Sequence, residues 1–153
     1  MTISYAITAC NEHKELSFLL DVLRNNIRQE DEIVIQLDSN ATEEVREVAK
    51  DYIEFPLNKD FASFKQNLSR HCTKEYIFQI DADEIPHTKL LELLPEIIEE
   101  NIECDVIMVP RINTVDGLTE EHVRKWGWHI NERGWVNWPD EQWRIYKNNS
   151  KSL

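Results

Sequence analysis

Three carboxylates follow an apolar segment near the middle of the chain. Asp81, Asp83 and Glu84 come directly after residues 76–80 (Tyr-Ile-Phe-Gln-Ile), which have the composition of a buried strand. Side chains two positions apart on an extended chain point the same way, so Asp81 and Asp83 can face one ligand while small Ala82 turns aside. Carboxylate oxygens suit the hard cations Mg²⁺ and Mn²⁺. The motif therefore predicts a divalent-metal site; the plainer alternatives are an exposed acidic loop and a helix N-cap.

Other kinds of acidic or phosphate-binding site fit the sequence less well. An EF-hand loop that began at Asp81 would need Gly at its sixth position, where this chain has Pro86. A phosphatase of the haloacid dehalogenase type also begins with a strand and Asp-x-Asp, but nothing after Asp105 convincingly supplies its later pair of acids. The chain has only 3 glycines, at positions 117, 127 and 134. Neither a dinucleotide-binding Gly-x-Gly-x-x-Gly loop nor a Walker A loop can therefore be written.

Length and net charge limit the number of domains and the kinds of partner that we expect. The 153 residues favour one domain, and the net charge of -12 disfavours nucleic acid and anionic membranes as partners. Three widely spaced cysteines, Cys10, Cys72 and Cys104, predict reduced core thiols and neither a disulfide framework nor a zinc site. The first residues lack the pattern of a signal peptide, and no stretch approaches the roughly 20 apolar residues of a membrane span. We therefore expect a cytoplasmic protein with no membrane span.

Apolar periodicity predicts an α/β protein in which strands and helices alternate. Strands are expected at residues 3–9, 32–37, 53–55, 76–80 and 105–110, and helices at 12–28, 42–52, 61–72 and 88–100. Thr42 and Asp60 are expected to cap the second and third of these helices. This order implies a mainly parallel central sheet with helices on both faces. Residues 114–141 resemble a loop-rich excursion, and residues 142–147 a last strand. Ligands of such sheets bind beyond the carboxyl ends of the strands, which here carry Asn11, Asp38 and Asp81.

Four segments carry a family resemblance. They are residues 7–12 (Ile-Thr-Ala-Cys-Asn-Glu), 37–40 (Leu-Asp-Ser-Asn), 60–67 (Asp-Phe-Ala-Ser-Phe-Lys-Gln-Asn) and 80–84 (Ile-Asp-Ala-Asp-Glu). In this order and on these elements they resemble the family 2 glycosyltransferases, whose GT-A fold binds nucleotide-diphosphate sugars. The third segment departs from the family's Ala-Arg-Asn helix at Lys65 and Gln66. The resemblance implies a single GT-A-like domain over residues 1–153, with a nucleotide-sugar-binding half at 1–110 and a short, Trp-rich acceptor side at 111–153.

The resemblance also implies roles for individual residues. Asp38 would hydrogen-bond the nucleobase, and Lys65 would stand near the nucleotide. Asp81 would lie beside the ribose or behind the direct metal ligands, and Asp83 would bind Mn²⁺ or Mg²⁺ directly. The complete set expected to contact the nucleotide is Thr8, Ala9, Asn11, Glu12, Asp38, Lys65, Asp81 and Ala82.

The C-terminal part supplies the candidate base. Residues 138–148 resemble a Pro-Asp-x-Gln-x-Arg-Leu-Phe-Arg-Asn stretch of some family members, in which a later His-Glu pair helps to complete the active site; this sequence contains no such pair. Asp140 is the candidate base, with Glu141 behind it. All five tryptophans lie at residues 126–143, where they could stack on sugar rings, form a local core or make a dimer contact. His129, among them, is either a third metal ligand or a structural or solvated histidine.

Together these features predict a metal-dependent glycosyltransferase. It would move a hexosyl group from a UDP-sugar to a hydroxyl of a sugar, lipid or protein acceptor, and the resemblance implies inversion in one displacement. Two alternatives remain: a non-catalytic or hydrolysing sugar-nucleotide-binding module, and a phosphatase of the dehalogenase type.

Overall fold

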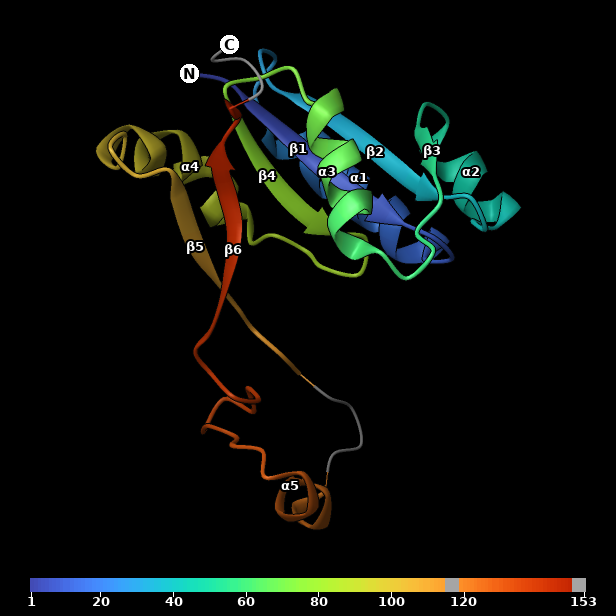
Figure 1. The fold of residues 1–153 in the computed structure, drawn as a ribbon. Helices are drawn as coiled ribbons and strands as arrows, with labels where there is room; N and C mark the ends of the chain where they lie inside the picture. The colour runs from blue at the N-terminus through green and yellow to red at the C-terminus, as the bar shows by residue number, and fades with distance from the viewer. Residues whose placement is uncertain (115–118, 150–153) are drawn as a thin grey trace.

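A six-stranded sheet forms the centre of the protein (Figure 1). The computed structural model describes residues 1–114 and 119–149. The strand order is β3-β2-β1-β4-β6-β5, and β1, β2, β3 and β4 run parallel to one another. The strands are β1 (Ile3–Ala9), β2 (Glu32–Asp38), β3 (Ile53–Phe55), β4 (Tyr76–Asp81), β5 (Val106–Arg111) and β6 (Asp140–Lys147). The prediction of a mainly parallel α/β sheet is confirmed.

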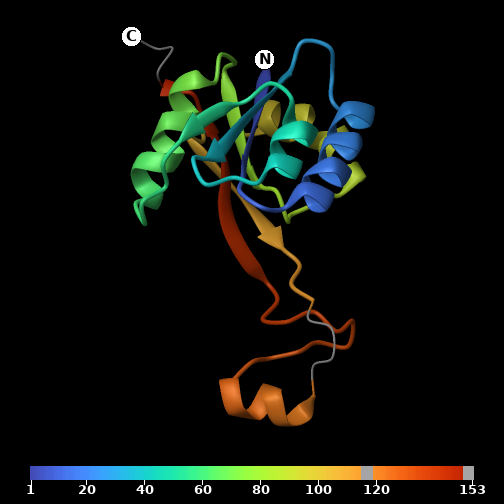
Figure 2. The same ribbon diagram turned by 90° about the vertical axis from the view of Figure 1, so that its right-hand side faces the viewer.

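Helices cover both faces of the sheet (Figures 1 and 2). On one face, α1 (His13–Asn26), α2 (Glu43–Ala49) and α4 (Thr88–Glu100) bury leucine, isoleucine and valine side chains in the main core. On the other face, α3 (Phe61–His71) packs Leu68 against Ala6 and Ile77. Parallel strands covered on both faces are largely apolar, which explains why Ser4 and Thr8 are the only small polar residues of β1. Of the three cysteines predicted to be core thiols, only Cys72 is buried, whereas Cys10 is half-buried and Cys104 is exposed.

Side-chain caps start two of these helices. Thr42 accepts a hydrogen bond from the amide of Val45 at 3.3 Å, and Asp60 accepts one from the amide of Ser63 at 3.0 Å. Such caps satisfy amide groups that have no partner within the helix. Both were predicted from the sequence, and the second fixes the start of the helix that carries Lys65.

The last strand departs from simple alternation. β6 lies between β4 and β5 and is antiparallel to both, which leaves β5 at the edge of the sheet. The pairing of β5 with β6 shifts register between Ile107 and Met108, whose partners are Ile145 and Trp143. Arg144 is therefore an extra residue at a β-bulge. Bulges bend a strand and re-aim a side chain, so a strict alternation of faces along β6 would have misplaced this arginine.

Residues 112–114 and 119–139, which we call the arm, leave the sheet between β5 and β6 and project away from it (Figures 1 and 2). The arm contains α5 (Glu120–Trp126), where the sequence predicted only a loop-rich excursion. Thr119 and His122 form a capping box, and Gly127 ends the helix with a φ of 65°, a conformation that glycine adopts without strain. None of the seven described residues of α5 is buried. The helix therefore has no buried apolar stripe, the signal by which helices were recognised.

No helix within residues 1–114 and 119–149 combines the length and apolar character needed to cross a membrane. The proposed boundary between a nucleotide-binding half and an acceptor half at residue 110 stays a prediction.

Candidate functional site

A pocket of about 350 Å³, the small pocket, lies beyond the carboxyl ends of β1, β2 and β4. The residues expected to contact a nucleotide line it, with the exception of Asn11. Asn11 is exposed in the turn after β1. The pocket lining consists of Thr8, Ala9, Cys10, Glu12, Asp38, Leu57, Phe61, Phe64, Lys65, Asp81, Ala82 and Asp83. The chain thus brings together residues from four separate segments, as the sheet topology requires.

The turn after β1 is held by the carboxylate of Glu12. Its Oε2 accepts hydrogen bonds from the amides of Cys10 at 2.7 Å and Asn11 at 3.0 Å. On the neighbouring strand, the amide of Ala82 donates to the carbonyl of Thr8 at 3.0 Å, and the Thr8 hydroxyl donates to Asp81 Oδ1 at 3.0 Å. These bonds tie the end of β1 to the end of β4 and so fix one wall of the small pocket.

Asp38 forms part of the pocket wall at the end of β2. Its Oδ1 accepts a hydrogen bond from the amide of Leu57 at 3.0 Å, and its Oδ2 accepts one from the Cys10 thiol at 3.8 Å. Burial, followed by the charges of Asp38 and Glu12, raises the pKa of Cys10 above the ordinary value of a thiol. Asp38 therefore links β2 to the loop before α3 while still lining the pocket.

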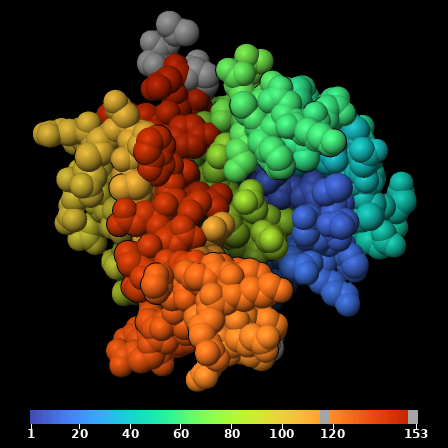
Figure 3. Space-filling model, turned by 60° about the horizontal axis from the view of Figure 1, so that its bottom comes forward, coloured from blue at the N-terminus to red at the C-terminus, as the bar shows by residue number. Residues whose placement is uncertain are grey.

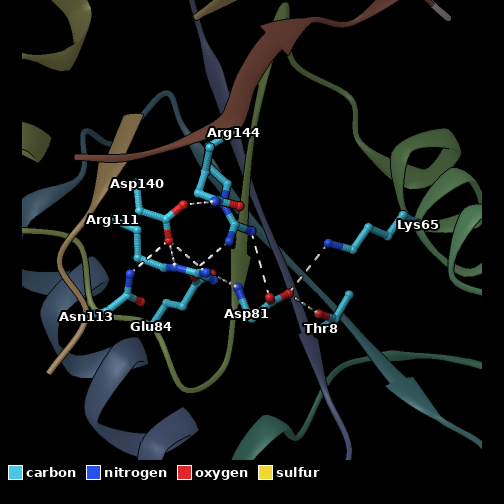
Figure 4. Close-up of polar contacts among 9 residues, drawn as sticks. Thr8, Lys65, Asp81, Glu84, Arg111, Asn113, Asp140 and Arg144 are labelled. Atoms are coloured by element: carbon cyan, nitrogen blue, oxygen red, sulfur yellow. Dashed lines mark hydrogen bonds and ion pairs between the residues drawn. The ribbon is translucent and has the colours of Figure 1, made fainter. Parts of the chain in front are cut away.

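Two cations approach the carboxylate of Asp81 from different elements (Figure 4). Lys65 Nζ, from α3, lies 3.7 Å from Oδ1, and Arg144 Nη1, from β6, lies 3.8 Å from Oδ2. Arg144 Nη2 also donates to Glu84 Oε2 at 2.7 Å. The other oxygen of Glu84 accepts a hydrogen bond from the backbone amide of Asp81 at 2.9 Å. Burial is the main cause that raises the pKa of Glu84, against the opposing effects of this hydrogen bond and of Arg144.

The row of alternating charges continues to the base of the arm. Arg111 Nη1 lies 3.8 Å from Glu84 Oε2, and Arg111 Nη2 lies 2.9 Å from Asp140 Oδ2. Asp140 also accepts hydrogen bonds from Asn113 at 2.8 Å and Gln142 at 2.7 Å. The hydrogen bond from Asn113, followed by those from Gln142 and Arg111, lowers the pKa of Asp140 below the usual aspartate value. Asp140 is therefore an ionised and well-anchored carboxylate at neutral pH, but a weaker base than a free one.

A second pocket of about 810 Å³, the large pocket, adjoins the first. Asp81 and Asp83 line both. The other walls of the large pocket come from β4, the start of α4, the end of β5 and β6, and include Glu84, Arg111, Asn113, Gln142 and Arg144. Figure 3 shows the yellow-green segment after β4 between the blue N-terminal region and the red β6. The two pockets thus meet at the acidic motif.

The donor set at this meeting point fits a hard divalent cation. Within residues 1–114 and 119–149 there is no group of three or more His, Cys, Asp or Glu side chains arranged to hold a metal. Mg²⁺, however, is commonly bound through one or two carboxylates together with water and substrate phosphates. Asp83, which is exposed, and Asp81 are carboxylates of this kind. His129 is exposed in the arm and belongs to neither pocket lining, so its role as a metal ligand stays a prediction.

The large pocket contains two arginines that were not identified from the sequence. Arg111 and Arg144 were not predicted as site residues, although Arg144 lies within the Pro-Asp-x-Gln-x-Arg stretch. Because Arg144 is the extra residue at a β-bulge, simple alternation along β6 does not give the direction of its side chain. Neither candidate base is among the residues that line the two pockets. Asp140 lies behind the large pocket, held by Arg111, Asn113 and Gln142, which do line it. Glu141 is exposed on β6.

Comparison with known proteins bears on the fold and the family of the chain. No curated protein sequence matches the chain significantly. Among solved structures, S. aureus TarS 1-349 superposes with a TM-score of 0.68 at 15% identity, over 97% of this chain and 48% of that chain. The same protein in complex with UDP gives a TM-score of 0.65 at 17% identity, over 78% of this chain and 38% of that chain. Its complex with UDP-GlcNAc gives 0.61 at 18% identity, over 78% and 36%.

These likenesses confirm the GT-A fold, and the chain spans about half the length or less of the solved structures it matches. The sequence model of glycosyl transferase family 2 matches residues 4–149. That match covers nearly the whole chain and confirms its resemblance to this family. The chain belongs to glycosyl transferase family 2.

Proposed function

We propose that this chain transfers a sugar from a UDP-sugar to a hydroxyl of a sugar, lipid or protein acceptor. The observation that carries the proposal is the meeting of the two pockets at Asp81 and Asp83. The small pocket has the position and residues for the nucleotide, and the large pocket has room for an acceptor. The TarS complexes with UDP and UDP-GlcNAc support uracil as the base.

Donor binding uses the strand-end residues. The nucleobase lies against Asp38 and the turn of residues 8–12, and the ribose lies near Thr8 and Asp81. Lys65 reaches the diphosphate from α3, which is held to β2 because buried Gln36 donates to the Phe64 carbonyl at 2.7 Å. Orientation by several fixed groups lowers the entropic cost of reaching the reactive geometry.

Asp83, with Asp81, would hold Mn²⁺ or Mg²⁺ at the diphosphate. Such an ion, when bound, neutralises the diphosphate and stabilises its departure. Repulsion between these carboxylates and the diphosphate is the reason that a cation is needed. One carboxylate about 4 Å from one phosphate charge costs roughly 4 kcal/mol at an effective dielectric constant near 20. Asp81, Asp83 and Glu84 together would repel an uncompensated diphosphate, even with Lys65 and Arg144 nearby.

The acceptor enters from the large pocket. Asp140 is our candidate to remove the proton from its hydroxyl, and Glu141 is the second candidate. A single displacement from the side opposite the leaving diphosphate inverts the anomeric centre. Hydrogen bonds from Arg111, Asn113 and Gln142 keep Asp140 ionised and oriented. Asp140 would therefore act as a base through its position more than through its basicity.

The same contacts also favour a second function. In the described structure each oxygen of Asp140 already accepts a hydrogen bond, Oδ2 from Arg111 and Asn113 and Oδ1 from Gln142. A chain that binds the donor yet transfers it slowly, or hydrolyses it, would have such a site. This is the sugar-nucleotide-binding module.

Thermal unfolding tests the proposal first. UDP should raise the melting temperature much more in the presence of Mn²⁺ than in EDTA, because a ligand of the native state stabilises that state. Equal shifts in both buffers would remove the argument for a metal bridge. Incubation with UDP-sugars and candidate acceptors then separates the two functions, since a transferase forms a glycosylated product and the binding module forms none, or only free sugar.

A further inference from the structure

The carboxylate of Asp81 has positively charged side chains on both of its oxygens before any ligand binds (Figure 4). We propose that Lys65 and Arg144 are resident counter-ions of Asp81, which keep the nucleotide-free site from binding a divalent cation tightly and so make metal and nucleoside diphosphate bind together. This inference rests on the proposed function and adds an order of binding to it.

The geometry places the two cations as competitors of a metal ion. Lys65 approaches Oδ1, which also accepts the Thr8 hydroxyl, and Arg144 approaches Oδ2. A cation that used either oxygen would come close to one of these charges. At 3.7 and 3.8 Å the pairs are close enough to weaken the attraction of Asp81 for a second cation.

Arg144 is the more firmly held of the two. Its side chain is only 10% exposed, whereas that of Lys65 is 37% exposed. Its Nη2 is anchored on Glu84 at 2.7 Å, and Glu84 is in turn held by the amide of Asp81. Arg144 therefore stays beside the acidic motif when a ligand arrives, and can turn one N–H group from Asp81 towards a phosphate oxygen.

The charge balance explains why two ligands bind better than one. Asp81, Asp83, Glu84 and Asp140 carry four negative charges, and Lys65, Arg111 and Arg144 carry three positive ones. The remaining single negative charge attracts a divalent cation only weakly and repels a diphosphate. When both ligands bind, the cation neutralises the diphosphate. Lys65 and Arg144 then leave the carboxylate of Asp81 and contact phosphate oxygens instead.

Removal of either counter-ion should therefore tighten metal binding in the absence of nucleotide. We expect Arg144→Gln and Lys65→Gln to bind Mn²⁺ about tenfold more tightly than wild type, in the usual range of coupling between two ligands. The factor by which UDP and Mn²⁺ strengthen each other should fall correspondingly. The measurement is a titration of Mn²⁺ followed by electron paramagnetic resonance, with and without UDP.

Lys147→Gln is the matched control. It removes one positive charge from the same strand, but at the far end of β6, where Lys147 Nζ lies 3.2 Å from Asp105 Oδ1. It should leave Mn²⁺ binding unchanged, whereas an equal gain in this variant would mean that net charge alone is responsible. If Arg144→Gln does not fold, Lys65→Gln decides the matter, because Lys65 is half-exposed on α3.

The outcomes separate this inference from the proposed function. If wild-type protein binds UDP equally well with and without Mn²⁺, the proposed metal-dependent function fails and the inference fails with it. If wild type shows the coupling but Mn²⁺ binding to the two variants is unchanged or weaker, only the inference is overturned. Weaker binding is the result expected if Arg144 merely holds the acidic turn in shape.

Discussion

The small pocket and the large pocket share two aspartates but are built from different kinds of structure. Parallel strands form the small pocket, and each contributes the residues at its carboxyl end, so short contiguous motifs supply nearly all of its lining. The large pocket depends on the antiparallel pair β5 and β6, whose charged side chains meet partners that are far away in the sequence. Local motifs therefore predict the proposed nucleotide site, whereas the proposed acceptor site, made of long-range ion pairs, can be recognised only from the fold.

The largest effect that would test this comparison is at Asp83, one of the two aspartates that both pockets share. Asp83→Ala should reduce the affinity for UDP in the presence of Mn²⁺ by a factor of about a hundred or more, in the range of hydrogen-bonded and charged groups that contact ligands directly. The fold should remain intact because Asp83 is exposed. Calorimetric titration measures the affinity, and Asp51→Ala, an exposed acidic residue after α2, is the control. Wild-type affinity in Asp83→Ala would show that the metal site is assigned wrongly.

The next effect separates the two pockets. Asp140→Asn should lower the transfer rate by about 10²- to 10⁴-fold, the usual contribution of a general base, with little change in UDP affinity. The amide keeps the shape of the carboxylate but cannot accept the proton. The rate is measured with a saturating UDP-sugar, and the affinity by calorimetry. A wild-type rate would place the base elsewhere, and Glu141→Gln would then be tested.

A third pair of variants compares the sheet with the arm. Leu20, on α1, is 1% exposed, whereas Trp126, on α5, is 49% exposed. Leu20→Ala should lower the free energy of unfolding by about 2–5 kcal/mol, because it leaves a cavity in the main core. Trp126→Ala should lower it by less than about 1 kcal/mol, since it loses only its stacking on His122 and Trp128. Urea unfolding measures both, and a large loss in Trp126→Ala would show that the arm packs against the body in solution.

The small pocket could be predicted from the sequence to a much greater extent than the large pocket. Asp38, Asp81 and the leucines of α1 were identifiable because strand ends and helical periodicity are local properties of the chain. The capping residues Thr42 and Asp60 were identifiable for the same reason. Arg144 was not, because a β-bulge shifts its side chain out of the simple alternation of a strand. Arg111 could be recognised as a site residue only from the fold, which pairs it with Glu84 and with Asp140, 29 positions away. The helix α5 has an N-terminal capping signal but no apolar stripe, and the prediction relied on the stripe.

The smallest expected effect tests the small pocket through the thiol of Cys10, which lines it. In a Cys104→Ser background, which removes the exposed thiol, UDP with Mn²⁺ should slow the alkylation of Cys10 several-fold because the nucleotide covers it.

The raised pKa of Cys10 also sets the pH dependence of this alkylation. Since only the thiolate reacts, the rate at pH 8 should be low, and it should continue to rise about tenfold per pH unit beyond the pH at which an ordinary thiol levels off. The reaction is followed by mass spectrometry, with the alkylation of Cys104 in wild-type protein as the internal comparison. Cys104 should react faster and be indifferent to UDP. If UDP with Mn²⁺ binds by calorimetry yet leaves the alkylation of Cys10 unchanged, the nucleotide occupies a place other than the small pocket.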